Sequence, residues 1–221
     1  MLIRPPNIGS DRVAVCGSQY MSHTHGEMTM TFKKGVLVAV LAGAMLPCLA
    51  TADSYTIDPL HTYPSIAFSH MGISVWRGKF NKTHGTITLD RSAKTGSADI
   101  VIDVASINFG LAAMDEKARS DDFFDVGRFP TATYKGAIKF SSDKPASVDG
   151  NITIRGITRP VMLNIELFNC IVHPMLKKEV CGAEAHGEVN WSEYGMKMSQ
   201  YGQGDAGKVQ LRIQVEAIKN D

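Results

Sequence analysis

Apolar and polar residues alternate without a break in KVQLRIQVEA, residues 208–217. Successive side chains of a β-strand point to opposite faces, so this stretch predicts a strand with one buried face and one wet face. The same alternation occurs at 97–104, 131–140 and 158–167, and more weakly at 65–70, 85–89, 147–154 and 186–191. These repeated short strands indicate an all-β fold.

Turn residues separate these strands. Asp149-Gly150 with Asn151, and Arg155-Gly156 before Thr158, predict two hairpins. Short strands of one apolar parity with frequent turns favour an antiparallel sandwich or barrel over βαβ units. A single domain over residues 53–221 accounts for all of them, because no helix-rich half is present to make a second domain.

One segment departs from the alternation. Leu111 to Asp122 places Leu111, Met114 and Ala118 at helical spacing, with charged residues on the other face. An aromatic group follows at Phe123, Phe124 and Phe129. We expect a short inserted helix that, with these rings, plugs one end of the sheet core. The alternative is that the same plug also lines the entrance to a cavity.

The N-terminal part predicts export. Lys33 and Lys34 precede an apolar run, Gly35 to Leu46, and the small residues Ala50-Thr51-Ala52 follow it. A basic region, a short apolar run and a small-x-small site are typical of a secretory signal peptide. We therefore expect a signal peptide over residues 28–52, cleavage after Ala52, and an over-extended gene start over residues 1–27. An uncleaved anchor and a lipoprotein anchored at Cys48 are the alternatives.

Charge and cysteine content narrow the function of residues 53–221. These residues contain 19 Lys and Arg against 20 Asp and Glu, a balance that offers nucleic acid no basic surface. Of the four cysteines, Cys170 and Cys181 lie in this part of the chain. Two neighbouring cysteines in an exported chain predict a disulfide. A thiol nucleophile and metal ligation are the alternatives, but no CxxC or zinc-type spacing accompanies them.

Several motifs resemble those of the YceI-like family. The stretch SIAFSHMG at 65–72 with Gly78-Lys79-Phe80 resembles the family's opening, and GNITIRGIT at 150–158 resembles its central signature. Asp121 to Asp125 with Phe129-Pro130, and the region from Asn169 to Met196, match in the same order. The resemblance implies a periplasmic, lipocalin-like antiparallel β-barrel that encloses a polyisoprenoid or a similar long-chain apolar ligand.

The alternation agrees with that implication. An eight-stranded barrel has an interior just wide enough for packed side chains or one slender ligand. The inward rows are almost wholly aliphatic or aromatic, which suits a hydrocarbon chain. We expect the ligand to contact residues of these rows, the plug and two Gly- or Met-bearing segments, namely Ile66, Phe68, His70, Trp76, Phe80, Ile102, Met114, Phe123, Phe124, Phe129, Trp191, Met196 and Met198.

Trp76 and Phe80 belong to a Gly-flanked segment that we expect to be a loop controlling access. Catalytic motifs are lacking in the sequence, since neither HExxH nor GxSxG occurs. We therefore expect a carrier rather than an enzyme, with no metal and no cofactor other than a bound polyisoprenoid or quinone-type lipid. Transient contact with a membrane surface and a homodimer are compatible with the sequence. The alternatives are an accessory enzyme or redox partner acting on an isoprenoid quinone, and a structural stress protein without cargo.

Overall fold

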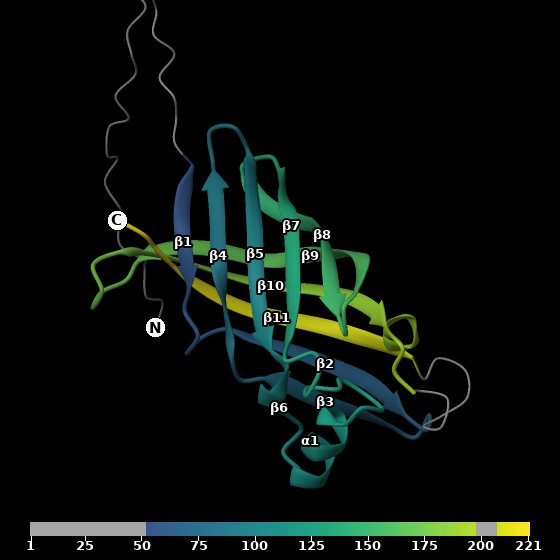
Figure 1. Ribbon diagram of the computed structural model, residues 1–221. Helices are drawn as coiled ribbons and strands as arrows, with labels where there is room; N and C mark the ends of the chain where they lie inside the picture. Colours follow the sequence, from purple (N-terminus) through teal and green to yellow (C-terminus); the bar gives the residue numbers. More distant parts are fainter. Residues whose placement is uncertain (1–51, 198–206) are drawn as a thin grey trace, which may run out of the picture. The chain divides into compact units, whose positions relative to one another are not determined.

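The computed structural model describes residues 52–197 and 207–221. Within these residues, eight antiparallel strands form a closed ring in which each strand pairs with the next and β11 returns to β1 (Figure 1). In ring order the strands are β1 (Asp53–Ile57), β4 (Thr83–Asp90), β5 (Thr95–Asp103), β7 (Thr131–Ser141), β8 (Lys144–Ile154), β9 (Ile157–Val172), β10 (Glu179–Asn190) and β11 (Lys208–Lys219). The predicted eight-stranded antiparallel barrel is confirmed.

Three further strands extend this ring on one side: β2 (Tyr63–His70), β3 (Ser74–Phe80) and β6 (Ile107–Asn108). The long strand β11 pairs both with its neighbours in the ring and with β2, one of the three further strands. Its second half pairs with β1 up to Tyr55↔Lys219, and its first half pairs with β2 from Val209↔Phe68. The segment that we expected to be a loop around Trp76 and Phe80 is strand β3, because its backbone completes ladders with both β2 and β6.

The two glycine-bearing turn signals have different outcomes. Arg155 and Gly156 both have positive φ, at 51° and 73°, and join β8 to β9 in the two-residue hairpin that such a pair favours. The hairpin predicted at Asp149-Gly150 is wrong, because both residues lie inside β8 opposite β7. A Cβ on Gly150 would lie 2.6 Å from the Tyr134 ring, so close packing and not a turn explains this glycine.

Strand β9 changes its inward row part-way along. A register shift between Glu184 and Ala185 of β10 pairs them with Leu167 and Ile165, which leaves Glu166 as the extra residue of a bulge. Leu163 and Ile165 face inward before the bulge, whereas Phe168 faces inward after it. Leu167, which the alternation placed in the inward row, is instead 63% exposed.

The plug has the predicted composition. Helix α1 (Ala112–Arg119) occupies the middle of the predicted segment 111–122, and two single-turn 3-10 helices lie at Val104–Ser106 and Trp191–Tyr194. The Phe124 ring lies edge-on to both Phe80 and Trp191, with centroids 5.6 and 5.3 Å apart. These rings are buried, so this end of the core is filled by aromatic side chains.

Asp122 ties the plug to the segment after Trp191–Tyr194. It accepts hydrogen bonds from Lys117, at 2.6 Å, and from Lys197, and these bonds lower the pKa of the Asp122 carboxyl to about 2. The lowered pKa stabilises the folded protein above about pH 4, and this contribution is lost as the pH falls through about 2. We expect Asp122→Asn to lower the urea midpoint at pH 7, with the difference from wild type disappearing below about pH 2. Asp121→Asn, at the exposed neighbouring position, is the control, and an equal loss in both variants would contradict the assignment.

Candidate functional site

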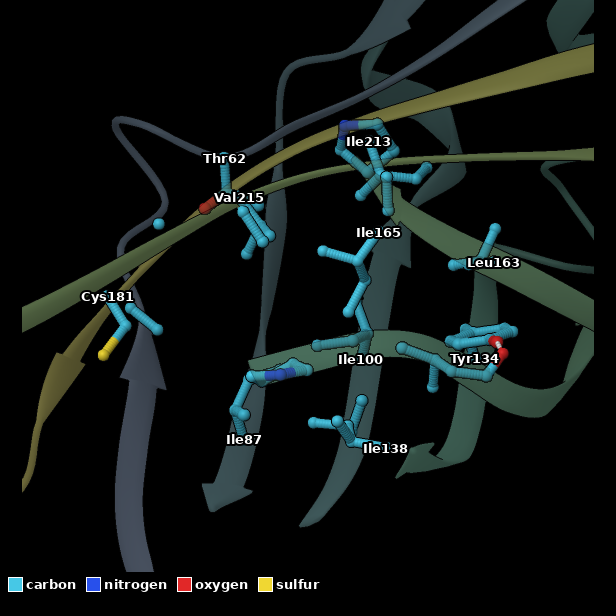
Figure 2. Close-up of a pocket in the computed structure, with 18 of the residues that line it drawn as sticks. Thr62, Ile87, Ile100, Tyr134, Ile138, Leu163, Ile165, Cys181, Ile213 and Val215 are labelled. Atoms are coloured by element: carbon cyan, nitrogen blue, oxygen red, sulfur yellow. Dashed lines mark hydrogen bonds between the residues drawn. The ribbon is translucent and has the colours of Figure 1, made fainter. Parts of the chain in front are cut away.

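A cavity of about 130 Å³ lies inside the ring (Figure 2). This is about ten times the ~10–15 Å³ that one water molecule needs. All eight ring strands contribute side chains to it, and β2 and the segment before it add Pro64 and Thr62. The aliphatic part of the wall consists of Ile87, Leu89, Ala98, Ile100, Ile102, Ile138, Val148, Ile152, Leu163, Ile165, Ala183, Ala185, Leu211, Ile213, Val215 and Ala217.

The strand pattern explains this wall. Inward positions recur at every second residue, and Leu211, Ile213, Val215 and Ala217 of β11 are four consecutive examples. Because short side chains such as Ala98, Ala183 and Ala185 stand in the wall among Ile and Leu of the other strands, the ring is not filled to its centre. The resulting space favours hydrocarbon, since an unpaired polar group placed there would lose its hydrogen bonds to water.

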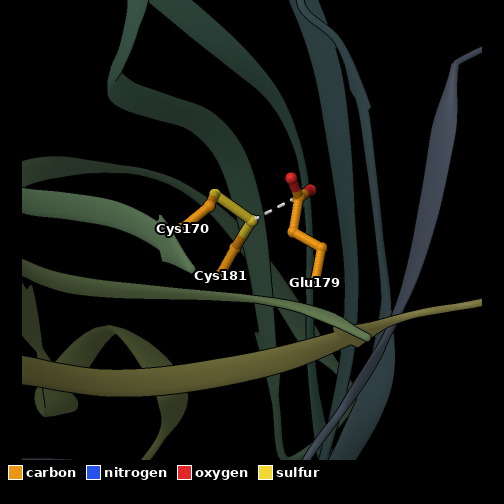
Figure 3. A group of neighbouring side chains, drawn as sticks. All are labelled: Cys170, Glu179 and Cys181. Carbon is orange, nitrogen blue, oxygen red and sulfur yellow. Dashed lines mark hydrogen bonds between the residues drawn. A yellow bond between two sulfur atoms is a disulfide. The ribbon is translucent and has the colours of Figure 1, made fainter. Parts of the chain in front are cut away.

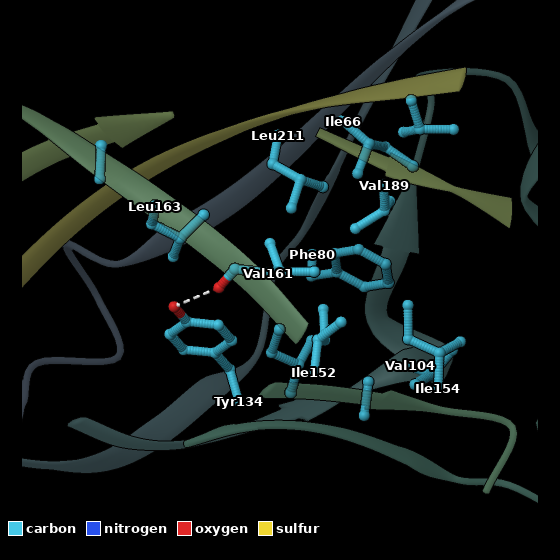
Figure 4. Close-up of a cluster of buried hydrophobic side chains, with 14 of the residues drawn as sticks. Ile66, Phe80, Val104, Tyr134, Ile152, Ile154, Val161, Leu163, Val189 and Leu211 are labelled. Carbon is cyan, nitrogen blue, oxygen red and sulfur yellow. Dashed lines mark hydrogen bonds between the residues drawn. The ribbon is translucent and has the colours of Figure 1, made fainter. Parts of the chain in front are cut away.

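Tyr134 is a polar side chain of this wall whose hydrogen bonds are complete. Its single hydroxyl proton is shared between two carbonyl oxygens, those of Val148 and Val161, each 3.0 Å from the hydroxyl oxygen. Figure 4 shows the bond to Val161. Burial raises the pKa of Tyr134 well above the usual value. The hydroxyl therefore stays protonated and joins β7 to β8 and β9, while its ring presents an apolar surface to the cavity.

Thr83 differs from Tyr134. It is buried at the start of β4 and lines the cavity, yet its Oγ1 has no hydrogen-bond partner among the described residues. An unsatisfied buried hydroxyl costs about 1–3 kcal/mol. We expect Thr83→Val to raise the free energy of unfolding by about 1 kcal/mol in urea titrations of the ligand-free protein. Thr83→Ser keeps the hydroxyl and should not stabilise; a destabilised Val variant would show that the hydroxyl has a partner.

A cluster of charged side chains surrounds the hydroxyl of Tyr55, whose side chain lines the cavity. We call it the rim cluster, and it consists of Asp53, Tyr55, Arg91, Glu179 and Lys219. The Tyr55 hydroxyl donates to Glu179, and Arg91 Nη2 donates to both, at 3.1 Å to the hydroxyl and 2.9 Å to the carboxylate. Asp53 completes the cluster, 2.7 Å from the Lys219 amine. Two cations and two carboxylates therefore compensate one another.

The pairing in the rim cluster sets its protonation. Burial, together with the hydrogen bond to Glu179, raises the pKa of Tyr55 far above its usual value. Burial alone would raise the pKa of the Glu179 carboxyl, but hydrogen bonds from Arg91 and Tyr55 outweigh it and hold that pKa below the usual value. Tyr55 thus stays neutral and Glu179 charged, and neither group is poised to exchange protons near neutral pH.

The predicted disulfide is confirmed: Cys170 of β9 and Cys181 of β10 are directly opposite each other and bonded (Figure 3). Cys181 also lines the cavity, and Arg91 Nη2 lies 3.2 Å from the Cys170 sulfur. The ligand atoms of Cys170, Glu179 and Cys181 lie within 4.8 Å of one another. Both sulfurs are held in the disulfide, so this group offers no thiolate to a metal.

The sequence pattern of the YceI-like domain matches residues 55–217. The chain belongs to the YceI-like family. A UPF0312 protein of Pseudomonas paraeruginosa is 30% identical over 194 residues, which cover 85% of this chain and 98% of the relative. A UPF0312 protein of Vibrio parahaemolyticus is 28% identical over 195 residues, with 85% and 99% covered.

Solved structures share the fold of this YceI-like domain. BcnA of Burkholderia cenocepacia aligns with a TM-score of 0.57 at 21% identity, over 72% of this chain and 98% of BcnA. A domain from Saccharophagus degradans, described as a polyisoprenoid binding domain implicated in plant cell wall breakdown, aligns with a TM-score of 0.54 at 13% identity, over 75% and 98%. At these identities the likeness establishes the architecture of the barrel.

Most of the residues predicted to contact the ligand lie in two regions of the structure, the cavity wall and the core outside that wall. Ile102 lines the cavity. Outside the cavity wall, the core contains Ile66, Phe68, Phe80, Phe123, Phe124, Trp191 and Met196, with Trp76 and Met114 packed against it. His70 stacks on Trp76 at 4.3 Å, and Phe129 lies against the Arg128 guanidinium. Met198 lies outside the described residues. For these residues, contact with a ligand stays a prediction.

The wall residues that the predicted contacts omitted have a clear signal in the sequence. Ile100 of β5 lies two residues before Ile102 and therefore faces the same side of the strand. Ile165 of β9 and Ile213 of β11 occupy the inward rows of their own strands in the same way. The predicted contacts instead favoured aromatic and methionine residues, which fill the plug. The rim cluster had no such signal, because Asp53, Arg91 and Glu179 are far apart in the sequence and meet only when the ring closes.

Proposed function

We propose that the protein is a periplasmic carrier that holds a polyisoprenoid or a similar long-chain apolar ligand inside the ring, without turnover. The observation that carries this proposal is the apolar cavity to which all eight strands contribute. The Saccharophagus degradans domain of the same fold, described as polyisoprenoid binding, supports the choice of ligand class. Binding rests on burial of the chain, at roughly 0.8 kcal/mol per methylene.

The compartment is part of the proposal. A signal-peptide-like stretch precedes residue 53, and the Cys170–Cys181 disulfide suits an oxidising compartment such as the periplasm. Within the described residues, none of the helices has the length and hydropathy needed to cross a membrane. In this account the ring shields the apolar chain while the carrier moves through water.

An enzyme acting on a quinone or prenyl head group is the second candidate, and the rim cluster is the observation that favours it. Such an enzyme needs titratable side chains at the cavity, and Tyr55 meets that condition. The cluster nevertheless uses its charges internally, since Arg91 pairs with both Glu179 and Asp53. The rim cluster is therefore better explained as a set of ion pairs that hold β1, β10 and the β4–β5 turn together than as an acid–base catalyst.

Uptake of a purified polyprenol tests the proposed function. We expect saturable binding of one molecule per chain and, at a free concentration of 100 times the Kd, a stabilisation of about 2.7 kcal/mol. For a domain of this size that corresponds to a rise in Tm of roughly 5–10 °C. A single-unit prenyl alcohol at the same concentration is the control and should leave the Tm unchanged. Absence of any shift with polyprenols and with quinones of long tail would contradict the proposal.

A further inference from the structure

The end of β9 and the turn that joins it to β10 carry several exposed apolar side chains. We define the hairpin tip as residues 171–178. Met175 is 82% exposed and Val172 is 70% exposed, and Ile171 and Leu176 are also exposed. Soluble domains rarely present several large apolar side chains together on one projecting turn, and such patches mark interaction sites.

The hairpin tip stands clear of the neighbouring strands. The ladder between β8 and β9 ends at Ser147↔Asn164, and the ladder between β10 and β11 ends at Val180↔Ile218. Figure 1 shows the turn extending beyond β1 and β4. Among the described residues, the tip therefore has no strand beside it that would cover its apolar side chains.

Two features hold the hairpin tip in a defined conformation. The Cys170–Cys181 disulfide joins the two strands immediately below it. Within the turn, the backbone N–H groups of Met175 and Leu176 donate to His173 Nδ1 at 3.3 and 3.2 Å. A turn ordered in this way presents its apolar side chains with little further loss of conformational entropy on binding.

The hairpin tip contains two lysines and no acidic residue of its own. No Asp or Glu occurs between Glu166 and Glu179, whereas Lys177 and Lys178 lie within the tip. Lys178 contacts Asp221 at 2.8 Å, and Lys177 is exposed. Exposed apolar side chains beside the exposed amine of Lys177 match the interface of a bilayer, where the apolar groups enter the acyl boundary and the amine remains at an anionic head group.

The same hairpin leads to the cavity. Phe168 of β9 and Cys181 of β10 line it, and Phe168 precedes Ile171 by three residues, roughly 10 Å of extended strand. We propose that the hairpin tip docks the protein on an anionic bilayer surface and places the cavity next to the membrane. Its use in loading or releasing an apolar ligand rests on the proposed function, but the docking itself does not.

Flotation with vesicles tests this proposal. The purified protein is mixed with vesicles of phosphatidylcholine containing about one-third phosphatidylglycerol, and the bound fraction is measured at low and high salt. We expect binding that salt weakens, and about a tenfold loss of affinity in Met175→Glu, because one large apolar contact is replaced by a charge repelled by the head groups. Lys177→Gln should reduce the dependence on phosphatidylglycerol while leaving the Tm unchanged.

Ile73→Glu is the matched control, since Ile73 is 81% exposed on the turn between β2 and β3. This variant should bind vesicles as wild type does. Equal loss in both variants, or no vesicle binding by wild type, would overturn the proposal. A change of sedimentation behaviour in Met175→Glu without vesicle binding would assign the tip to a second copy of the chain instead. Polyprenol uptake measured without vesicles separates failure of docking from failure of the proposed function.

Discussion

Replacing Ala98 and Ala185 with phenylalanine is expected to weaken polyprenol binding by at least about fiftyfold, because the two added rings would displace at least three methylenes of the ligand, at roughly 0.8 kcal/mol each. Ala98 of β5 and Ala185 of β10 both line the cavity, and the order of strands places them on opposite sides of the ring. The change narrows the lumen from two walls without adding a polar group. The dissociation constant for polyprenol, from titration of the purified variant, is the measurement.

The control for this substitution is Ala137→Phe, which places the same side chain on the exposed face of β7. It should bind polyprenol as wild type does. Overpacking a core costs typically about 1–3 kcal/mol, so the free energy of unfolding is measured alongside binding. If the double variant proves too unstable, Ala98→Leu alone should weaken binding about tenfold. Unchanged affinity in a folded double variant would place the ligand outside this cavity.

Loss of the disulfide is expected to lower the free energy of unfolding by about 3 kcal/mol in a variant with Cys170→Ala and Cys181→Ala. The bond closes a short loop with a sequence separation of 11 and lies at the base of the hairpin tip. For a domain of this size the loss corresponds to a fall in Tm of roughly 6–12 °C. Urea unfolding of wild type and variant measures it.

Reduction provides a check on the disulfide that needs no mutation. Dithiothreitol should reduce the stability of wild type to near that of the double alanine variant, and should leave the variant itself unchanged. A difference below about 1 kcal/mol would show that the ladder between β9 and β10 already orders this hairpin without the cross-link. Vesicle flotation of the same variant reports whether the hairpin tip still binds when its base is no longer fixed.

Strand positions were the most predictable part of the fold. The alternation at 208–217 corresponds to β11 at Lys208–Lys219, and that at 131–140 corresponds to β7 at Thr131–Ser141. A strand of this kind can be recognised from its own residues alone, because apolar and polar side chains alternate wherever one face of the strand is buried. Leu167 shows the limit of this reasoning, because a bulge reverses the parity and depends on how β10 pairs with β9.

Pairing between distant segments explains the remaining errors. Asp149-Gly150 is typical of a turn when only the local sequence is considered, but both residues pair with β7 and continue strand β8. The glycine is needed there because the Tyr134 ring leaves no room for a side chain at position 150. Trp76 and Phe80 form a strand because β2 and β6 provide partners. The rim cluster likewise depends on closure of the ring, which brings Arg91 of the β4–β5 turn to Glu179 of β10.

Native mass spectrometry of the protein, expressed with its N-terminal segment in a Gram-negative host and purified, decides whether the ring holds an apolar lipid. We expect a discrete mass added to that of the polypeptide, which organic extraction releases as a prenyl or quinone lipid. A mass equal to the polypeptide alone, with no uptake of added polyprenol, would contradict this expectation and indicate a structural protein without cargo.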